Sequence, residues 1–340
     1  MVERRSQDHY RGCLLGGAVG DAMGAAVEFM GLEEIRRTFG PSGITEPAEA
    51  YGRTGAVTDD TQMTLFSAEA LIRGHNRWLG RGIASVVRVG HRAYLRWLHT
   101  QTGGLPEDLL DGWLVRVEGL HHSRSPGGTC IAALASGRAG TMERPLNDSK
   151  GCGGVMRAAP AGLAGVDDSF AAGCELAAIT HGHPTGYLAA GLFAHIVRCL
   201  ADGSNLGDAI SRGLERREAR PGHEETLRAV EQAVELAATP GPAERVESLG
   251  QGWVAEEALA IGLYCALVAK DFASGVLLAV NHGGDSDSTG SIAGQIVGAI
   301  RGEEAIPARW LERLELREVI AGVADALWQE AAPAYLSGRP

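Results

Sequence analysis

Glycine recurs at every fourth residue in two separate segments of the chain, and this spacing strongly restricts how the chain can fold. The residues between these glycines are mainly apolar, which predicts two helices, because residues four apart share one helix face. A face without Cβ atoms lets another backbone approach closely, and without such packing each interior glycine costs about 0.5–1 kcal/mol relative to alanine. We predict that the two helices form the centre of the molecule, with packing against each other as one possible arrangement, whereas flexible glycine-rich loops are the alternative. The glycines are Gly12, Gly16, Gly20 and Gly24 in the first segment and Gly290, Gly294, Gly298 and Gly302 in the second.

Two stretches place carboxylate and hydroxyl residues where helical patterns begin. One is Thr58-Asp59-Asp60-Thr61, and the other is Asp285-Ser286-Asp287-Ser288-Thr289, which leads into the second glycine segment. Asp, Ser and Thr favour helix starts because their oxygens accept the unpaired N–H groups. Oxygen ligands suit Mg²⁺, Mn²⁺ or Ca²⁺ better than zinc or copper. We predict that the two helix starts converge on a pair of hard metal ions, and two independent capping clusters are the alternative.

The second stretch also resembles the beginning of an EF-hand calcium loop. Asp285, Asp287, Thr289 and Gly290 would occupy its positions one, three, five and six. The bidentate glutamate of such a loop would then fall at Ile296, so the sequence excludes this alternative.

Three further groups of residues are candidates for a functional site. Asp21 and Glu28 lie at or beyond the end of the first glycine-lined helix, where either is a candidate acid–base group or a surface or capping residue. The segment 149–157 is a glycine-rich loop of a kind that can present backbone N–H groups to phosphate, although a tight turn is equally compatible with it. This loop has neither the Walker order nor a dinucleotide-binding fingerprint. His181 begins a His-Gly-His-Pro segment and is expected at a pocket wall or in a helix connection.

Charge and cysteine content limit the possible partners. Lys and Arg number 31 against 42 Asp and Glu, which gives a net charge of −11. This balance argues against broad electrostatic binding to nucleic acid or to an anionic membrane, but it leaves a local basic pocket open. The six cysteines have no metal-finger spacing, and no segment approaches the ~20 apolar residues of a membrane span. We expect reduced thiols and a cytoplasmic protein.

Helical periodicity dominates the chain, and alternating strand patterns are few, so the expected fold is mainly α. The clearest break is Thr239-Pro240-Gly241-Pro242. Because the two acidic helix starts lie on opposite sides of this break, we expect one domain over residues 1–340. The helices expected besides those above cover residues 82–99, 129–137, 168–182, 185–202, 206–238, 253–270, 272–280 and 308–332.

Taken in order, six motifs resemble the ADP-ribosylglycohydrolase family, and together they cover essentially the whole chain. They are G-x-x-x-G-D-A-M-G-A-A-V-E from Gly16 to Glu28, T-D-D-T from Thr58 to Thr61, K-G-C-G-G-V-M-R-A-A-P from Lys150 to Pro160, T-H-G-H-P-T-G-Y from Thr180 to Tyr187, G-W-V-A-E-E-A-L from Gly252 to Leu259, and G-G-D-S-D-S-T-G from Gly283 to Gly290.

The resemblance implies a single compact all-α domain with two Mg²⁺ or Mn²⁺ ions in a central cleft, and hydrolytic removal of ADP-ribose from a modified protein. Ser149, Lys150, Gly151, Cys152 and Gly153 match the family's loop around the diphosphate and distal ribose, and His181 matches a histidine that lines the ADP-ribose cleft. For the proton transfer of the reaction the candidates are Glu28, Asp60 and Asp287. The residues that match metal ligands are Thr58, Asp59, Asp60, Asp285, Asp287 and Ser288.

The form D-S-D-S-T-G resembles arginine-directed members of the family, including the type that activates dinitrogenase reductase. This implies cleavage of the N-glycosidic bond of ADP-ribosylarginine, with an ADP-ribosylated protein as substrate and ADP-ribose as product. Three alternatives remain open. They are hydrolysis of ADP-ribose linked to serine or acetyl oxygen, a metal-dependent phosphohydrolase of nucleotide-sugar diphosphates, and a protein that binds ADP-ribose without cleaving it.

Overall fold

The structure is a computed structural model that describes residues 6–217, 221–239, 241 and 243–330. It is all-α, as the sequence predicts, and the strands in the described residues are the short antiparallel pair β1 (Glu49–Ala50) and β2 (Arg53–Thr54). The α-helices are α1 (Gln7–Gly24), α2 (Leu32–Phe39), α3 (Asp59–Arg81), α4 (Val86–Thr102), α5 (Gly128–Ala135), α6 (Ala159–Leu163), α7 (Ser169–Ala178), α8 (Pro184–Ala201), α9 (Leu206–Arg217), α10 (Glu224–Ala237), α11 (Ala255–Val268), α12 (Phe272–Val280), α13 (Ser286–Arg301), α14 (Ala308–Leu311) and α15 (Arg317–Glu330).

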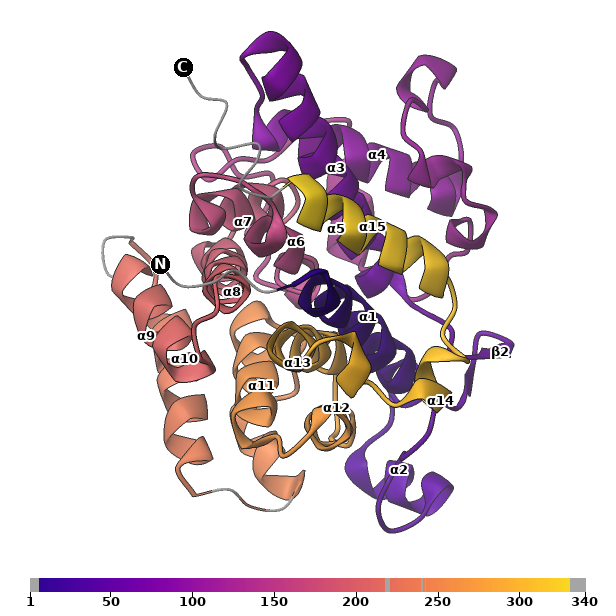
Figure 1. The fold of residues 1–340 in the computed structure, drawn as a ribbon, viewed down its shortest axis with the longest axis vertical. Coiled ribbons are helices and arrows are strands. Elements are labelled where there is room, and N and C mark those ends of the chain that lie inside the picture. Colours follow the sequence, from indigo (N-terminus) through magenta and orange to yellow (C-terminus); the bar gives the residue numbers. More distant parts are fainter. Residues whose placement is uncertain (1–5, 218–220, 240, 242, 331–340) are drawn as a thin grey trace.

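Helices α1 and α13 lie against each other at the centre of the molecule (Figure 1). Their glycines pair in antiparallel order, Gly12 with Gly298, Gly16 with Gly294, and Gly20 with Gly290. A Cβ atom added at any of these positions would fall within 3.0 Å of the partner helix's backbone. The predicted central position of the two glycine-lined helices is therefore confirmed, and their partners are each other.

This antiparallel packing brings the end of α1 to the start of α13. Gly24, the last residue of α1, lies against Ser286, the first residue of α13. Helices α11 and α12 pack on the other sides of α13, while α15 packs on α1 (Figure 1). The two central helices are thereby buried along most of their length. Acidic residues at this junction are therefore held inside the protein by its most closely packed pair of helices.

Two expected helices are interrupted in the structure. The segment 206–238 forms α9 and α10, and Gly222, with a φ of +79°, lies in a turn before α10. The segment 308–332 forms α14 and α15, and Leu316 between them has a φ of +58°. Periodicity missed the second interruption because Leu311, Leu314 and Leu316 continue the apolar pattern, whereas Pro221-Gly222 is a turn signal that marks the first. Residues 218–220, 331 and 332 of these segments, and Pro240 and Pro242 of the expected break, lie outside the described residues.

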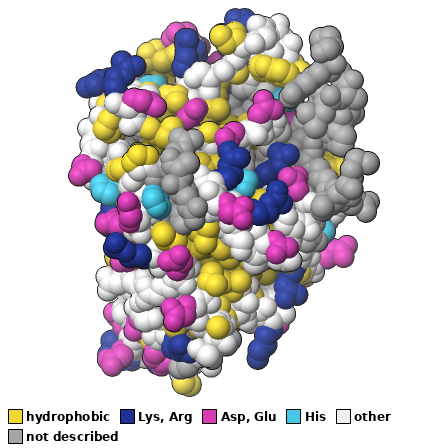
Figure 2. Space-filling view, turned by 90° about the vertical axis from the view of Figure 1, so that its left-hand side faces the viewer, with side chains coloured by type: hydrophobic (Ala, Val, Ile, Leu, Met, Phe, Trp, Pro, Cys, Tyr) yellow, Lys and Arg dark blue, Asp and Glu magenta, His cyan; other side chains and the backbone are white. Residues whose placement is uncertain are grey.

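The face of the molecule in Figure 2 carries acidic and basic side chains interspersed with hydrophobic ones. Neither sign of charge gathers into a broad field among the described residues visible on this face. Among the described residues, no helix is both long and apolar enough to cross a membrane.

We predict that Gly20→Ala lowers the free energy of unfolding by about 3 kcal/mol or more, because the new methyl group meets the backbone of α13 and not a movable side chain. Gly322→Ala is the control, since Gly322 lies within α15 and has no neighbour within 4 Å of the added Cβ. That substitution should stabilise the protein by about 0.5–1 kcal/mol. Urea unfolding measures both changes, and equal effects of the two substitutions would contradict the close helix pair.

Candidate metal centre

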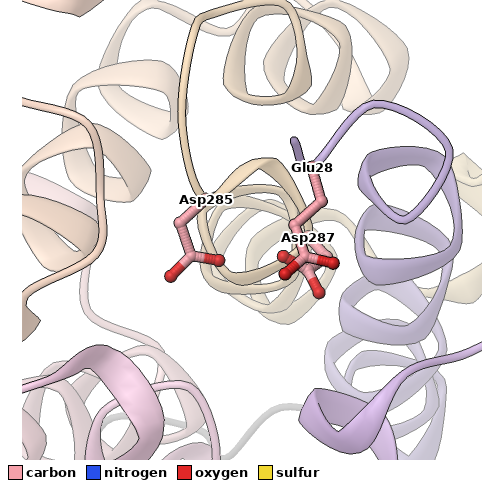
Figure 3. Close-up of side chains that lie close together, drawn as sticks. All are labelled: Glu28, Asp285 and Asp287. Atoms are coloured by element: carbon pink, nitrogen blue, oxygen red, sulfur yellow. The ribbon is translucent and has the colours of Figure 1, made fainter. Parts of the chain in front are cut away.

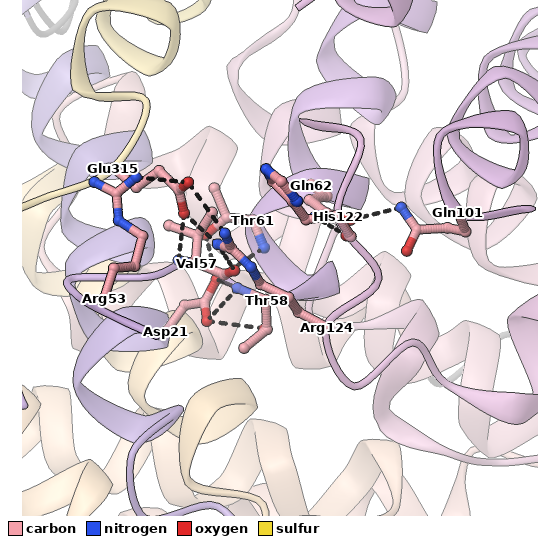
Figure 4. Close-up of polar contacts among 10 residues, drawn as sticks. All are labelled: Asp21, Arg53, Val57, Thr58, Thr61, Gln62, Gln101, His122, Arg124 and Glu315. Carbon is pink, nitrogen blue, oxygen red and sulfur yellow. Dashed lines mark hydrogen bonds and ion pairs between the residues drawn. The ribbon is translucent and has the colours of Figure 1, made fainter. Parts of the chain in front are cut away.

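Asp21 joins the last turn of α1 to the first turn of α3 (Figure 4). Its carboxylate accepts hydrogen bonds from the Thr58 backbone N–H at 3.0 and 3.1 Å and from the Thr58 hydroxyl at 2.9 Å. The backbone N–H of Thr61 donates to the same carboxylate at 3.1 Å, and the Thr61 hydroxyl also donates to it. Asp21 is fully buried, so these bonds replace the water it loses. Asp21 is therefore engaged in holding the start of α3, which places Asp59 and Asp60.

A buried ion pair positions a residue beside Glu28 that the sequence did not single out. Arg124 forms an ion pair with Glu315, and its guanidinium donates to the carbonyl of Val57 at 3.0 Å (Figure 4). The next residue, Ser125, donates from its hydroxyl to Glu28 Oε2 at 3.0 Å. The segment around residue 124 thus fixes both the entry to α3 and the orientation of the Glu28 carboxyl.

The start of α13 is held by a loop that requires glycine. Gly284 has a φ of +152°, and a Cβ atom there would overlap the carbonyl of Gln251. That same carbonyl accepts the backbone N–H of Asp285 at 2.8 Å. Asn281 anchors the beginning of this loop through two hydrogen bonds to the backbone of Ile44, at 2.8 and 2.9 Å. The carboxylate of Asp285 is thereby aimed from a rigid backbone.

Acidic side chains from three parts of the chain meet at this place. Glu28, Asp285 and Asp287 each offer one oxygen atom, and these three atoms lie within 4.8 Å of one another (Figure 3). Asp59 and Asp60 lie near enough to the same group for the charge of Asp287 to raise the pKa of both. The structure therefore brings the two predicted helix starts together. We call Glu28, Asp59, Asp60, Asp285 and Asp287 the acidic cluster.

Burial makes the acidic cluster electrostatically costly. All five carboxyl groups are at least 94% buried, and desolvation is the largest cause of a raised pKa at each of them. Burial and the nearby Asp287 raise the pKa of Glu28 to about 9. The same two causes raise the pKa of Asp21, beneath the cluster, to about 7. Like charges in a site of low polarity need a positive counter-charge or protons.

The unsatisfied atoms of the cluster fit divalent cations. Asp60 Oδ2 and Asp285 Oδ2 are buried without a hydrogen-bond partner among the described residues. Of the hydroxyl residues, Thr58 interacts with the Asp287 carboxylate, and Ser288 is buried next to Asp287 in the sequence. A donor set made only of oxygen atoms matches hard ions such as Mg²⁺ and Mn²⁺. Glu28, which the sequence marked as an acid–base candidate, lies close enough to Asp285 and Asp287 to share an ion with them.

The glycine-rich loop reaches this centre through Cys152, whose thiol interacts with Asp285 and Ser288. Three of the loop's backbone N–H groups are already bonded within the protein. Ser149 donates to Asn147 Oδ1, Gly151 donates to the Ser149 hydroxyl, and Cys152 donates to the carbonyl of Trp253. These bonds hold the loop in one conformation, and they leave these three N–H groups unable to donate to a phosphate.

His181 and Lys150 have defined partners beside this loop. His181 is buried under Gly153, where a Cβ atom would meet the imidazole ring at 2.9 Å. Burial, and secondarily the charge of Arg157, lowers the pKa of His181 to about 3, so the ring is neutral. The ammonium group of Lys150 lies 2.8 Å from Glu225 and 2.5 Å from Glu256. Lys150 thus carries a compensated charge.

Comparison with known proteins agrees with the all-α fold. The model of the ADP-ribosylglycohydrolase family matches residues 3–336. The ADP-ribosyl-[dinitrogen reductase] glycohydrolase of Rhodospirillum rubrum is 28% identical over 314 residues, which cover 91% of each chain. The ADP-ribosylarginine hydrolase Tri1 of Serratia proteamaculans is 25% identical over 345 residues, covering 97% of this chain and 82% of the relative.

A solved structure described as an ADP-ribosylglycohydrolase-related protein complex superimposes on this fold with a TM-score of 0.69. It is 28% identical, and the match covers 96% of this chain and 99% of that one. The chain therefore belongs to the ADP-ribosylglycohydrolase family of hydrolases.

The raised pKa values predict how the stability of metal-free protein depends on pH. A carboxyl whose pKa is higher in the folded than in the unfolded chain lowers the unfolding free energy as pH rises between those two values. For Asp21 and Glu28 this window extends from about 4 in the unfolded chain to about 7 and about 9 in the folded protein. In EDTA we expect the thermal midpoint to fall from about pH 5 to about pH 9, and to fall less with Mg²⁺ or Mn²⁺.

Differential scanning calorimetry across this pH range measures the effect. The double variant Asp60→Asn/Asp285→Asn removes two of the buried charges, so its midpoint should depend less on pH and respond less to the cations. A thermal midpoint that rises with pH in EDTA, or that is unchanged by Mg²⁺ and by Mn²⁺, would contradict the electrostatic description of the cluster.

Proposed function

We propose that the protein removes ADP-ribose from modified protein side chains in a metal-dependent hydrolysis, and that the bond it cleaves is the N-glycosidic bond of ADP-ribosylarginine. The observation that carries the proposal is the acidic cluster, where buried carboxyl groups from the end of α1, the start of α3 and the start of α13 meet. Family membership supports the hydrolysis of an ADP-ribosyl bond. The name of the Serratia relative supports an arginine acceptor, and the name of the Rhodospirillum relative supports a modified protein as substrate.

The residues proposed to hold two Mg²⁺ or Mn²⁺ ions are oxygen donors from the two helix starts. When bound, such ions supply Lewis acidity, which polarises the hydroxyl groups of a sugar and makes water a better nucleophile. The unpartnered oxygens of Asp60 and Asp285 support the assignment. The full set is Thr58, Asp59, Asp60, Asp285, Asp287 and Ser288, with Glu28 near enough to contribute.

Cleavage of the bond between ribose and guanidine requires a proton for the leaving nitrogen and water at the anomeric carbon. Positive charge develops on the ribose as the bond breaks, and buried carboxylates stabilise it. We assign proton transfer to Glu28, with Asp60 and Asp287 as further candidates. The raised pKa of Glu28 allows its carboxyl to hold a proton near neutral pH, and the Ser125 hydroxyl fixes its orientation.

The proposed binding site for the diphosphate and distal ribose is the loop of Ser149, Lys150, Gly151, Cys152 and Gly153, with His181 beneath it. Its contact with Asp285 through Cys152 places this loop next to the acidic cluster. Because the charge of Lys150 is compensated by Glu225 and Glu256, its role here is to fix the loop. Neutral His181 supplies a hydrogen-bonding wall without adding charge.

We place this activity in the cytoplasm, with an ADP-ribosylated protein as the substrate and without nucleic acid or membrane partners. All six cysteines are free thiols, which suits a reducing compartment.

A parallel assay tests the proposal. We expect release of free ADP-ribose from ADP-ribosylarginine with Mg²⁺ or Mn²⁺, and its loss in EDTA. Asp60→Ala and Asp287→Ala should each lower kcat/KM at least about a hundredfold, because they remove buried oxygen donors. Glu231→Ala, at an exposed position of α10, is the control and should keep full activity. Chromatography of the products gives the rates.

The same assay includes Glu28→Gln, which keeps the shape of the side chain but cannot transfer the proton. This variant should still bind ADP-ribose and should lose most of its turnover. Preferred cleavage of serine-linked or O-acetyl-linked ADP-ribose would show that the acceptor is not arginine. Release of AMP and ribose phosphate would indicate a phosphohydrolase, and binding without any turnover would indicate an ADP-ribose-binding protein.

A further inference from the structure

One helical hairpin of this acidic chain carries six arginines and no acidic residue. Between Glu69 and Glu107 the sequence contains no aspartate or glutamate, although the whole chain carries a net charge of −11. This segment covers the second half of α3, the turn after it and all of α4 (Figure 1). Four-residue spacing puts the arginines of each helix on one face. They are Arg73, Arg77 and Arg81 on α3 and Arg88, Arg92 and Arg96 on α4.

Four of these arginines surround a cavity of about 320 Å³ between α3 and α4. Arg73 and Arg77 line it from α3, and Arg92 and Arg96 line it from α4. We call this space the arginine cavity. Its acidic wall residue is Asp111, which comes from the loop that follows α4.

The carboxylate of Asp111 already lies among the arginines of the cavity. Its carboxylate lies 2.6 Å from Arg73 Nη2, 3.0 Å from Arg96 Nη1 and 3.8 Å from Arg92 Nη2. Three guanidinium groups thus converge on one carboxylate, which is the geometry used to bind carboxylate and phosphate.

The arginine cavity retains uncompensated positive charge. Arg96 is buried and is also bonded to the buried Glu69, at 2.7 Å. Four guanidinium groups therefore face two carboxylates, Glu69 and Asp111. Arg77 makes no ion pair with the described residues, and the side chain of Arg92 is 51% exposed at 3.8 Å from its acidic neighbour. The excess charge lies on these two residues, one on each helix.

We propose that the arginine cavity binds a small phosphate-bearing anion between Arg77 and Arg92. The volume suits a group the size of a diphosphate, and two guanidinium groups from opposite helices can each bond a phosphate oxygen pair. This is a second site, separate from the acidic cluster. Arg77 follows Asp60 by 17 residues along α3, which is about 25 Å at 1.5 Å per residue. The proposal of this anion site does not depend on the proposed hydrolysis.

Calorimetric titration with inorganic pyrophosphate tests this site. The wild-type chain should bind pyrophosphate, with an affinity that falls as salt is added. Arg77→Gln/Arg92→Gln should weaken binding about tenfold or more by removing both uncompensated charges. The control Arg37→Gln/Arg228→Gln removes the same charge from exposed positions outside the cavity, and it should bind as the wild type does.

Two further measurements keep the proposal open to refutation. Circular dichroism shows whether each double variant is folded, and a crystal of the wild-type chain soaked in pyrophosphate should show density between α3 and α4. Vesicles of anionic lipid are included because Trp78, Leu79 and Ile83 are exposed at the nearby end of α3 and in the turn after it. No binding of pyrophosphate, equal binding by the cavity variant and the wild type, or binding to vesicles alone would overturn the proposal.

Discussion

The contact between the backbones of α1 and α13 is the constraint on which the rest of the structure depends. Glycine at matched positions allows this contact, and each pair leaves no space for a Cβ atom. Because the helices run antiparallel, the carboxyl end of α1 and the amino end of α13 are forced together. Glu28 follows the first of these ends and Asp287 lies at the second. A polar junction inside the molecule is therefore a direct consequence of the glycine spacing.

The acidic cluster opposes folding unless something neutralises it. Desolvation raises the pKa of every carboxyl in it, and Asp287 adds repulsion for its neighbours. Close packing of the helices, the hydrogen bonds to Asp21 and the buried pair of Arg124 with Glu315 hold these groups in place against that repulsion. An arrangement that is costly by itself and rigidly supported is typical of a site that binds cations. Metal binding and protein stability are therefore expected to be linked.

The sequence predicted the central helix pair and the two helix starts because both are local patterns. Glycine spacing on α1 and α13 predicts close approach, and Asp next to Thr or Ser predicts the start of a helix. The role of Asp21 could not be predicted, because it depends on the folded position of Thr58. Ser125 reaches Glu28 only because Arg124 pairs with Glu315, 191 residues away in the chain. The interruption at Leu316 was also missed, since the apolar pattern around it remains helical.

The most direct test of this account is anomalous X-ray diffraction from a crystal of the protein soaked in Mn²⁺. We expect manganese peaks between the starts of α3 and α13, beside the carboxylate oxygens of Asp60, Asp285 and Asp287. Crystals with no anomalous peak there, or with manganese bound only elsewhere on the protein, would contradict it.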